Sequence, residues 1–227
     1  MYRFAVKRFF DIVLSFVAIV LLAIPMLIVA IAIKIDDPGP VLFKQKRVGK
    51  KKNGQITYFQ IWKFRSMKMC TPHDVPTHLL ENPEQYITKV GKFIRKTSLD
   101  ERPQIYQVFV GKLSVVGPRP ALWSQDDLVA EREKYGANDV KPGITGWAQI
   151  NGRDELEIHV KAKFDGDYTA ALNAGKFSGF WMDVRCFFGT FISVLKSDGV
   201  VEGGTGEMKK KEAATRDADR EKEEITK

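Results

Sequence analysis

The stretch from Ile12 to Ile33 reads IVLSFVAIVLLAIPMLIVAIAI and contains no charged residue. At about 1.5 Å of rise per residue, a straight helix of these 22 residues would just cross a hydrocarbon layer of roughly 30 Å. Pro25 lies in the middle of the run, where it removes a backbone donor and clashes with the carbonyl of Leu21. The sequence therefore predicts an apolar membrane helix with a kink or break at Pro25.

Basic residues flank this run on both sides. Lys7 and Arg8 precede it, and further lysines and an arginine follow it between Lys34 and Lys52. Positive charge marks the cytoplasmic side of a membrane, so both ends of the run are expected on that side. We therefore favour a re-entrant membrane helix over residues 1–36. The alternatives are a single membrane span and a cleaved signal peptide, although the run is long for a signal peptide and has no small-residue cleavage site before Lys34.

The composition favours a protein that works at a membrane surface. The chain has 36 Lys and Arg against 28 Asp and Glu, a formal net charge of +8. Such an excess attracts anionic lipid headgroups and phosphorylated substrates. We expect no nucleic acid partner, because the sequence has no zinc spacing, recognition-helix pattern or aromatic single-strand signature. Cys70 and Cys186 lie far apart without metal-type spacing, so neither a disulfide framework nor a zinc site is expected.

The remaining polar sequence predicts one compact catalytic domain, residues 37–202, of mainly helical α+β class. Asn53-Gly54 lies between two β-prone segments, Val41 to Val48 and Gln55 to Phe64, and this arrangement predicts a small β-hairpin. Helices are expected over residues 87–96, 100–110, 124–135, 154–172 and 179–196.

The last predicted helix, residues 179–196, is heavily aromatic. Phe180, Trp181, Phe187, Phe188 and Phe191 recur in it at helical spacing. The pattern is typical of a helix that lies in a membrane interface, and equally of one that packs into a protein core. Periodicity alone leaves both interpretations open. Beyond it the chain loses its apolar residues, so residues 203–227 are predicted to be a charged, disordered tail.

Two adjacent carboxylates, Asp100 and Glu101, occur in the stretch Thr97-Ser98-Leu99-Asp100-Glu101-Arg102-Pro103. Ser98 and Glu101 have the spacing of a capping box, so one interpretation is purely structural. With Ser98 as the N-cap, however, Pro103 would fall at the fifth helical position and disturb the helix. A helix that starts at Asp100 would place Pro103 in the tolerated first turn. In both cases the carboxylates lie at a helix N-terminus, where backbone N–H groups also attract phosphate oxygens.

Isolated basic residues in Gly- and Pro-punctuated segments favour a functional interpretation of this acid pair. Any one of them could simply be solvated or ion-paired, but together they could neutralise a diphosphate whose oxygens a divalent cation bridges to a carboxylate. One of two adjacent acids can attack or bind metal while the other handles a proton. The candidates are Lys63, Arg65, Arg95, Arg119 and Arg153.

These residues lie in segments that, in order along residues 2 to 200, resemble the monotopic phosphoglycosyl transferase family. Its members are bacterial sugar transferases that load undecaprenyl phosphate with the first sugar of a glycan. The chain resembles the minimal form of the family, without the membrane helices and domain that precede the catalytic unit in larger relatives. The matching segments are Lys7 to Asp11, Pro25 within the apolar run, Gly39 to Gln45, Lys63 to Met67, Arg95 to Glu101, Val116 to Pro120 and Lys141 to Arg153.

The resemblance implies a reaction in which UDP-sugar and polyprenyl phosphate give polyprenyl diphosphate sugar and UMP. Asp100 would attack the sugar-bearing phosphorus and hold the phosphosugar covalently, and Glu101 would assist proton transfer or help to seat a cation. Mg²⁺ is the cofactor of the family, and Asp100 is the residue expected nearest to it. Pro25 would break the re-entrant helix. The residues expected to contact phosphate are Lys63, Arg65, Arg95, Arg119 and Arg153.

The resemblance also implies a location at the cytoplasmic face of a bacterial inner membrane and a role in exopolysaccharide or lipopolysaccharide assembly. The lipid bilayer and downstream glycosyltransferases would be partners. Two other functions stay open. One is a membrane-bound scaffold that binds anionic lipid and has an inactive acid pair, which the intact acids and arginines argue against. The other is a phosphotransferase for soluble substrates, which a requirement for a lipid acceptor would exclude.

Overall fold

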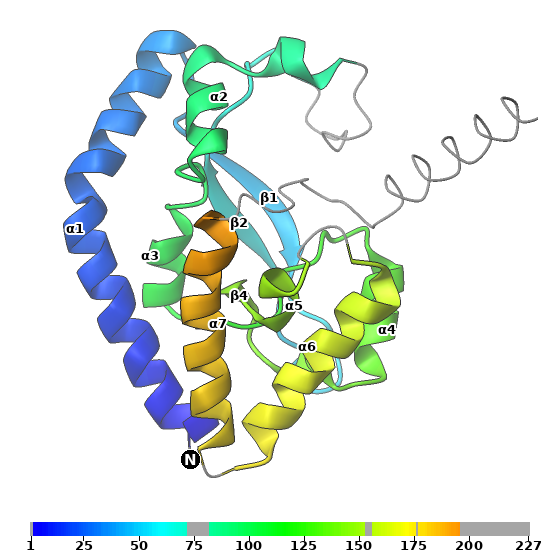
Figure 1. Cartoon of the computed structure of the whole chain (residues 1–227). Coiled ribbons are helices and arrows are strands. Elements are labelled where there is room, and N and C mark those ends of the chain that lie inside the picture. The colour runs from blue at the N-terminus through cyan, green and yellow to red at the C-terminus, as the bar shows by residue number, and fades with distance from the viewer. Residues whose placement is uncertain (1, 72–81, 153–155, 176, 196–227) are drawn as a thin grey trace, which may run out of the picture.

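The computed structural model describes residues 2–71, 82–152, 156–175 and 177–195. A long helix, α1 (Lys7–Asp36), follows a short π-helical turn, η1 (Tyr2–Val6), and lies along one side of a smaller mixed domain (Figure 1). The mainly helical α+β class is therefore confirmed for the described residues. The predicted tail, residues 203–227, lies outside them, as do Arg153 and the predicted helix start at residue 154.

Helix α1 is uninterrupted from Lys7 to Asp36, with Pro25 inside it. Figure 1 shows it bowed along its length rather than divided into two helices. The structure thus differs from the predicted helix-break-helix. A proline removes one donor from the helical ladder, and an apolar helix tolerates this where its neighbours compensate. The re-entrant topology stays a prediction.

The predicted hairpin is confirmed. Strands β1 (Leu42–Val48) and β2 (Tyr58–Phe64) pair antiparallel, with Leu42 opposite Phe64 and Val48 opposite Tyr58. Asn53 and Gly54 both have positive φ, 49° and 76°, which the favoured two-residue hairpin turn requires.

Short helices cover this hairpin and the remaining core. The helix predicted at residues 100–110 begins only at Gln104, because Asp100 to Pro103 form turns and Pro103 is the N-cap.

The capping-box interpretation of Ser98 is wrong. Ser98 has a left-handed φ of 52° and lies just past the end of the preceding helix. The helices are α2 (Lys89–Lys96), α3 (Gln104–Phe109), α4 (Asp126–Glu133), α5 (Trp147–Ile150), α6 (Ile158–Asn173) and α7 (Ser178–Leu195), with 3₁₀ turns η3 (Pro83–Tyr86) and η4 (Ala137–Asp139).

A second, parallel strand pair was not predicted. Strand β3 (Ser114–Val116) pairs with β4 (Gly143–Thr145), and the amide of Gly117 donates to the carbonyl of Thr145 at 2.7 Å. The strands approach so closely that a Cβ on Gly143 would lie 2.1 Å from the Gly117 nitrogen. Glycine is therefore required here by the close approach of two backbones.

Two apolar clusters connect α1 and α7 to this framework. Met26, Val29 and Ile33 of α1 pack with Phe64 of β2 and Ile94 of α2. A second cluster joins α6 and α7 to β3 and contains Val116, Val140, Tyr168, Leu172 and Cys186.

Helix α7 has one face packed into the protein core and one exposed aromatic face, so it combines the two interpretations that its sequence pattern left open. Cys186 on this helix is fully buried in the core. Trp181, Phe188, Phe191 and Ile192 are each more than half exposed. One face of α7 is therefore core, and the other presents aromatic rings away from the core.

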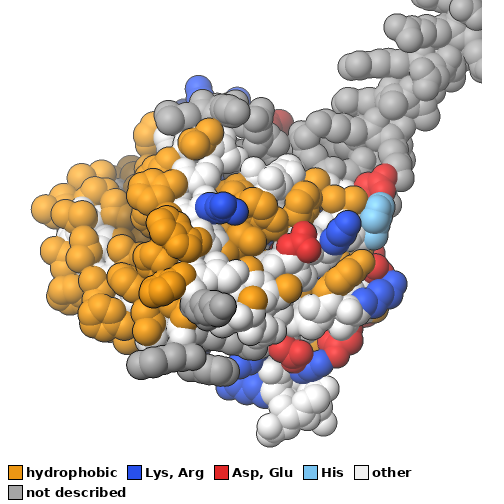
Figure 2. Space-filling view, turned by 60° about the horizontal axis from the view of Figure 1, so that its bottom comes forward, with side chains coloured by type: hydrophobic (Ala, Val, Ile, Leu, Met, Phe, Trp, Pro, Cys, Tyr) orange, Lys and Arg blue, Asp and Glu red, His pale blue; other side chains and the backbone are white. Residues whose placement is uncertain are grey.

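Most of the apolar surface of α1 is also exposed. Its side chains include Leu21, 70% exposed, and Ile24, 72% exposed, and Figure 2 shows hydrophobic side chains gathered over one side of the molecule. Among the described residues α1 is the one helix long and apolar enough to cross a membrane, with a mean hydropathy of 3.2 and only 6% of that window buried. So little burial excludes an ordinary core helix, and we conclude that α1 associates with a membrane.

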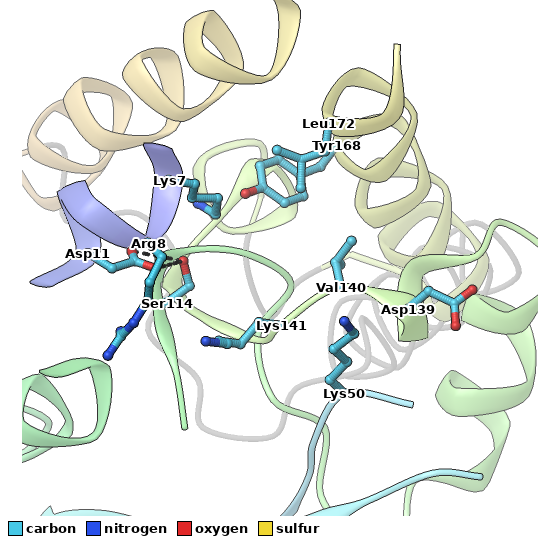
Figure 3. Close-up of a pocket in the computed structure, with 10 residues that line it drawn as sticks. All are labelled: Lys7, Arg8, Asp11, Lys50, Ser114, Asp139, Val140, Lys141, Tyr168 and Leu172. Atoms are coloured by element: carbon cyan, nitrogen blue, oxygen red, sulfur yellow. Dashed lines mark hydrogen bonds between the residues drawn. The ribbon is translucent and has the colours of Figure 1, made fainter. Parts of the chain in front are cut away.

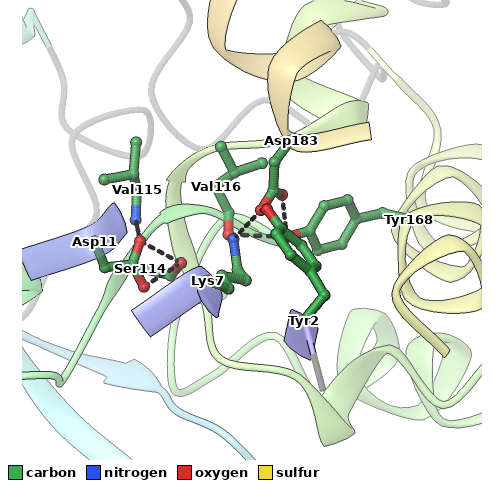
Figure 4. Close-up of polar contacts among 8 residues, drawn as sticks. All are labelled: Tyr2, Lys7, Asp11, Ser114, Val115, Val116, Tyr168 and Asp183. Atoms are coloured by element: carbon green, nitrogen blue, oxygen red, sulfur yellow. Dashed lines mark hydrogen bonds and ion pairs between the residues drawn. The ribbon is translucent and has the colours of Figure 1, made fainter. Parts of the chain in front are cut away.

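Both ends of α1 are fixed to the same domain. At the N-terminal end, the Lys7 ammonium pairs with Asp183 of α7 at 2.7 Å, and Asp11 accepts from the Val115 amide at 2.8 Å (Figure 4). At the C-terminal end, Asp36 accepts from the Val90 amide at 2.8 Å. The two ends of the apolar helix thus lie against one body.

Candidate active site

A cavity of about 130 Å³ lies at the carboxyl ends of β3 and β4, between the start of α3 and the C-terminal half of α7. Ligands of α/β proteins commonly bind at this end of parallel strands, because the loops that follow the strands converge there. The lining includes Ser98, Glu101, Arg119, Thr145, Gln149 and Thr190.

The backbone around the acid pair is held from three directions. The left-handed Ser98 ends α2, and the Leu99 amide then bonds back to the Ile94 carbonyl at 2.8 Å. The Asp100 carbonyl accepts from the Phe64 amide, at the end of β2, at 2.7 Å. Asp100 and Glu101 are therefore fixed where α2, β2 and α3 meet, a placement that suits groups that must be preorganised.

Glu101 is the centre of a partly buried group of charges. One of its oxygens, Oε1, lies 3.2 Å from the Lys63 ammonium and 3.0 Å from the Arg119 guanidinium. The exposed fractions of these side chains are 6% for Lys63, 18% for Glu101 and 23% for Arg119. Two cations on one shielded carboxylate oxygen balance its charge and fix its direction.

A buried ion pair holds the backbone of the loop that carries Arg119. Arg132 of α4 pairs with Asp165 of α6 at 2.6 Å and donates to the Arg119 carbonyl at 3.0 Å. Arg47 also donates to the carbonyl of Pro120, at 3.2 Å. The position of Arg119 therefore depends on side chains that do not line the cavity.

Among the described residues, Arg119 is the one predicted phosphate contact that lines this cavity, and Lys63 lies against the lining residue Glu101. Arg65 is buried and pairs with Asp37, the C-cap of α1, at 3.1 Å. The Arg95 guanidinium donates to the Ser66 hydroxyl at 2.8 Å. Arg153 lies outside the described residues. The structure thus brings together Lys63, Glu101 and Arg119, and connects Arg65 to the end of the membrane helix.

The described part of the chain contains no group of three or more His, Cys, Asp or Glu side chains that could hold a metal by itself. Mg²⁺ often binds through one or two carboxylates and takes its other ligands from substrate phosphates and water. Asp100 and Glu101 supply two neighbouring carboxylates of this kind, although Glu101 is already engaged by two cations. Asp100 and Glu101 are therefore suitable ligands for a Mg²⁺ ion that takes its other ligands from a phosphorylated substrate.

Gln149 on α5 is a pocket residue that the sequence interpretation did not select. Its amide oxygen and nitrogen are buried and have no hydrogen-bond partner among the described residues. Nearby, the hydroxyls of Thr145 and Thr190 share a hydrogen bond of 2.5 Å. The one available signal was the position of Gln149 in the Gly-rich stretch from Gly143 to Arg153, which resembles the family but does not by itself assign a role.

Comparison with known proteins gives a consistent result. A sequence model described as Bacterial sugar transferase matches residues 2–197. The UDP-glucose:undecaprenyl-phosphate glucose-1-phosphate transferase of Escherichia coli K12 is 39% identical over 195 residues, 80% of this chain and 38% of that protein. An exopolysaccharide production protein of Rhizobium leguminosarum is 38% identical over 201 residues, 83% of this chain and 94% of that protein.

A third relative, from Aeromonas hydrophila, carries a different sugar in its name. It is a UDP-N-acetylgalactosamine-undecaprenyl-phosphate N-acetylgalactosaminephosphotransferase, 35% identical over 200 residues, 86% of this chain and 44% of that protein. The chain thus spans about two fifths of the length of the relatives from E. coli and A. hydrophila, and nearly the whole length of the one from R. leguminosarum.

Proposed function

Since the chain belongs to the bacterial sugar transferase family, we propose that it transfers a sugar phosphate from a UDP-sugar to undecaprenyl phosphate. The products would be undecaprenyl diphosphate sugar and UMP. The observation that carries the proposal is the shielded Lys63–Glu101–Arg119 group, which follows Asp100 in the chain and whose Glu101 and Arg119 line a cavity that also includes residues of α7. Cations around a carboxylate pair suit the transfer of a phosphoryl group, which needs positioning and charge stabilisation above all.

The transfer proceeds in two displacements. In the first, an Asp100 carboxylate oxygen attacks the sugar-bearing phosphorus, a P–O bond forms, and the bond to UMP breaks. In the second, a phosphate oxygen of undecaprenyl phosphate attacks the same phosphorus and releases Asp100. Glu101, held by Lys63 and Arg119, is the proposed acceptor of the proton of the incoming phosphate. A bound Mg²⁺ would neutralise charge on the diphosphate, with Asp100 as its proposed protein ligand.

Arg119 and Lys63 are the proposed phosphate contacts with support from the geometry, because both cations point to the carboxylate beside the cavity. Arg153 stays a proposed phosphate contact on the resemblance alone. Arg65 pairs with Asp37 and is better explained as a support for the end of α1, whereas Arg95, which donates to the Ser66 hydroxyl, stays a proposed phosphate contact on the resemblance. The cavity is smaller than the roughly 300–1,000 Å³ of sites that enclose a whole ligand, so it would hold only part of a nucleotide sugar.

The arrangement of α1 supports a one-sided membrane topology. Lys7 and Asp36, near opposite ends of the helix, contact the same domain, so a simple span with a free far end does not fit. We propose a re-entrant topology in which both ends of the bowed helix α1 lie at the cytoplasmic face, where UDP-sugars are found, and its exposed apolar side chains enter the bilayer. The exposed rings of Phe188 and Phe191 lie close along the chain to Thr190, which lines the cavity. An acceptor phosphate held at the interface could therefore reach Asp100 by lateral diffusion.

UMP release tests the proposal. The purified chain with Mg²⁺ is given UDP-glucose, UDP-galactose and UDP-N-acetylhexosamines, each with and without undecaprenyl phosphate. Lipid-dependent UMP release with one donor supports the reaction and identifies the sugar, whereas equal turnover without lipid indicates a soluble acceptor instead. Asp100→Asn should abolish release, while Asp126→Asn, which removes an exposed carboxylate on α4, should leave it intact. No release with any donor, together with no phosphosugar on the protein, would favour a scaffold.

A further inference from the structure

A second cavity, of about 200 Å³, lies at the N-terminal end of α1 and shares no lining residue with the candidate active site. Four cationic side chains line it. Lys7 and Arg8 come from α1, Lys50 from the segment after β1, and Lys141 from the segment before β4 (Figure 3). Three separate parts of the chain thus bring positive charge to one hollow.

The two carboxylates in this hollow are already engaged. Asp11 accepts hydrogen bonds from the Ser114 hydroxyl at 2.9 Å and from the Val115 amide at 2.8 Å (Figure 4). Asp139 lies 3.4 Å from the ammonium of Lys51, which is not a lining residue. Neither carboxylate forms an ion pair with a cation of the cavity among the described residues.

The cations differ in how their charge is balanced. The positive charge of Lys7 is balanced by an ion pair with Asp183 at 2.7 Å. Arg8 donates to two peptide carbonyls, those of Val108 and Phe109, each at 2.6 Å. These carbonyls hold the guanidinium in place without cancelling its charge.

Among the described residues, Lys50 and Lys141 are the two cavity cations whose charged groups are not engaged by a direct contact. Neither ammonium has a hydrogen-bond or ion-pair partner among the described residues, and both side chains are only partly exposed. Burial first, and then the nearby Arg8 charge, lowers the pKa of Lys141, and the Asp11 carboxylate offsets this only in part. An anion between Lys50 and Lys141 would offset it further, because it would add opposite charge.

We propose that this cavity binds a phosphate-type oxyanion through Lys50 and Lys141, and that the ligand is the headgroup phosphate of an anionic membrane lipid. The cavity has room for such a group, since one water occupies about 30 Å³. A lipid is favoured over a free anion because Phe9 and Phe10, next to Lys7 and Arg8 in the chain, are 63% and 41% exposed. The acyl chains of a lipid held here could lie along this apolar part of α1. The proposal does not depend on the proposed transferase reaction.

Titration calorimetry on the full chain in uncharged detergent tests the site. The probes are dihexanoyl phosphatidylglycerol and inorganic phosphate. The double variant Lys50→Gln/Lys141→Gln should weaken binding of the lipid probe by at least about tenfold, because two direct charge contacts are lost. The matched control, Lys52→Gln/Lys112→Gln, removes the same charge from exposed lysines outside the cavity and should change affinity less than about twofold.

Each other outcome overturns a stated part of the proposal. Equal loss in the control double variant, or no saturable binding of either probe, would show that no site exists. Binding of inorganic phosphate as tight as that of phosphatidylglycerol would overturn the lipid assignment. If the double variant does not fold by circular dichroism, Lys50→Gln alone should weaken binding and Lys141→Arg should retain it. The reverse pattern for these single variants would contradict the contacts.

Discussion

The support of Arg119 by Arg132 allows a quantitative prediction. Arg132 and Asp165 are 4% and 0% exposed, so the variant Arg132→Met would leave the Asp165 carboxyl in the core without its arginine partner. Removing one member of a buried pair typically costs about 3–5 kcal/mol. The lost hydrogen bond to the Arg119 carbonyl is worth about 1 kcal/mol and falls within this range.

For a protein of this size, 1 kcal/mol shifts Tm by about 2–4 °C, so thermal unfolding of Arg132→Met in detergent should occur roughly 6–20 °C below the parent. UMP release, measured well below Tm, should also fall because the Arg119 loop loses its support. The control is Glu131→Gln, which breaks a pair with Lys134 whose lysine side chain is 65% exposed. This variant should leave Tm close to that of the parent, because an exposed ion pair contributes little to stability.

Removing both members of the Arg132–Asp165 pair provides a second test. Burial raises the pKa of the Asp165 carboxyl in spite of Arg132, which means that desolvation of the pair is expensive. The double variant Arg132→Met/Asp165→Leu removes both charges and should recover most of the lost stability. A Tm for Arg132→Met within about 2 °C of the parent would refute the account of this support.

Gly117→Ala should destabilise the protein by about 1–3 kcal/mol in chemical unfolding, because its Cβ would lie 2.4 Å from the Lys141 carbonyl oxygen; wild-type stability would contradict the close β3–β4 approach. At pH 8, maleimide should label Cys70, which is exposed, and not Cys186, which is buried with the pKa of its thiol raised to about 12; the higher pKa leaves almost no thiolate, so rapid labelling of both would refute this. Cysteines introduced at residues 3 and 50 of a Cys70→Ser/Cys186→Ala background should react from the same side of the membrane, and labelling from opposite sides would exclude the re-entrant topology.

The sequence predicted the elements that local patterns specify. The apolar run predicts α1, and Asn53-Gly54 predicts the hairpin, because helix hydropathy and turn chemistry are encoded by neighbouring residues. The acid pair and Arg119 were also predicted, and the structure places Glu101 and Arg119 in one cavity. These were found by resemblance and charge rather than by any calculation of spatial proximity.

The missed features depend on contacts between distant segments. Strands β3 and β4 contain three residues each, too few to show a strand period, and their pairing depends on glycines that look like ordinary loop residues. Arg65 resembles a phosphate ligand in the sequence, yet it pairs with Asp37, 28 residues earlier. The buried amide of Gln149 is recognisable only when the surrounding side chains are placed.

The most direct test of the account is intact-mass measurement of the protein after incubation with its UDP-sugar and Mg²⁺ in the absence of lipid. We predict a mass increase of one sugar phosphate that maps to the Asp100 peptide, disappears when undecaprenyl phosphate is added, and is absent in Asp100→Asn. Lipid-dependent product formation that continues in Asp100→Asn, or a phosphosugar mapped to another residue, would contradict the assignment of Asp100 as the nucleophile.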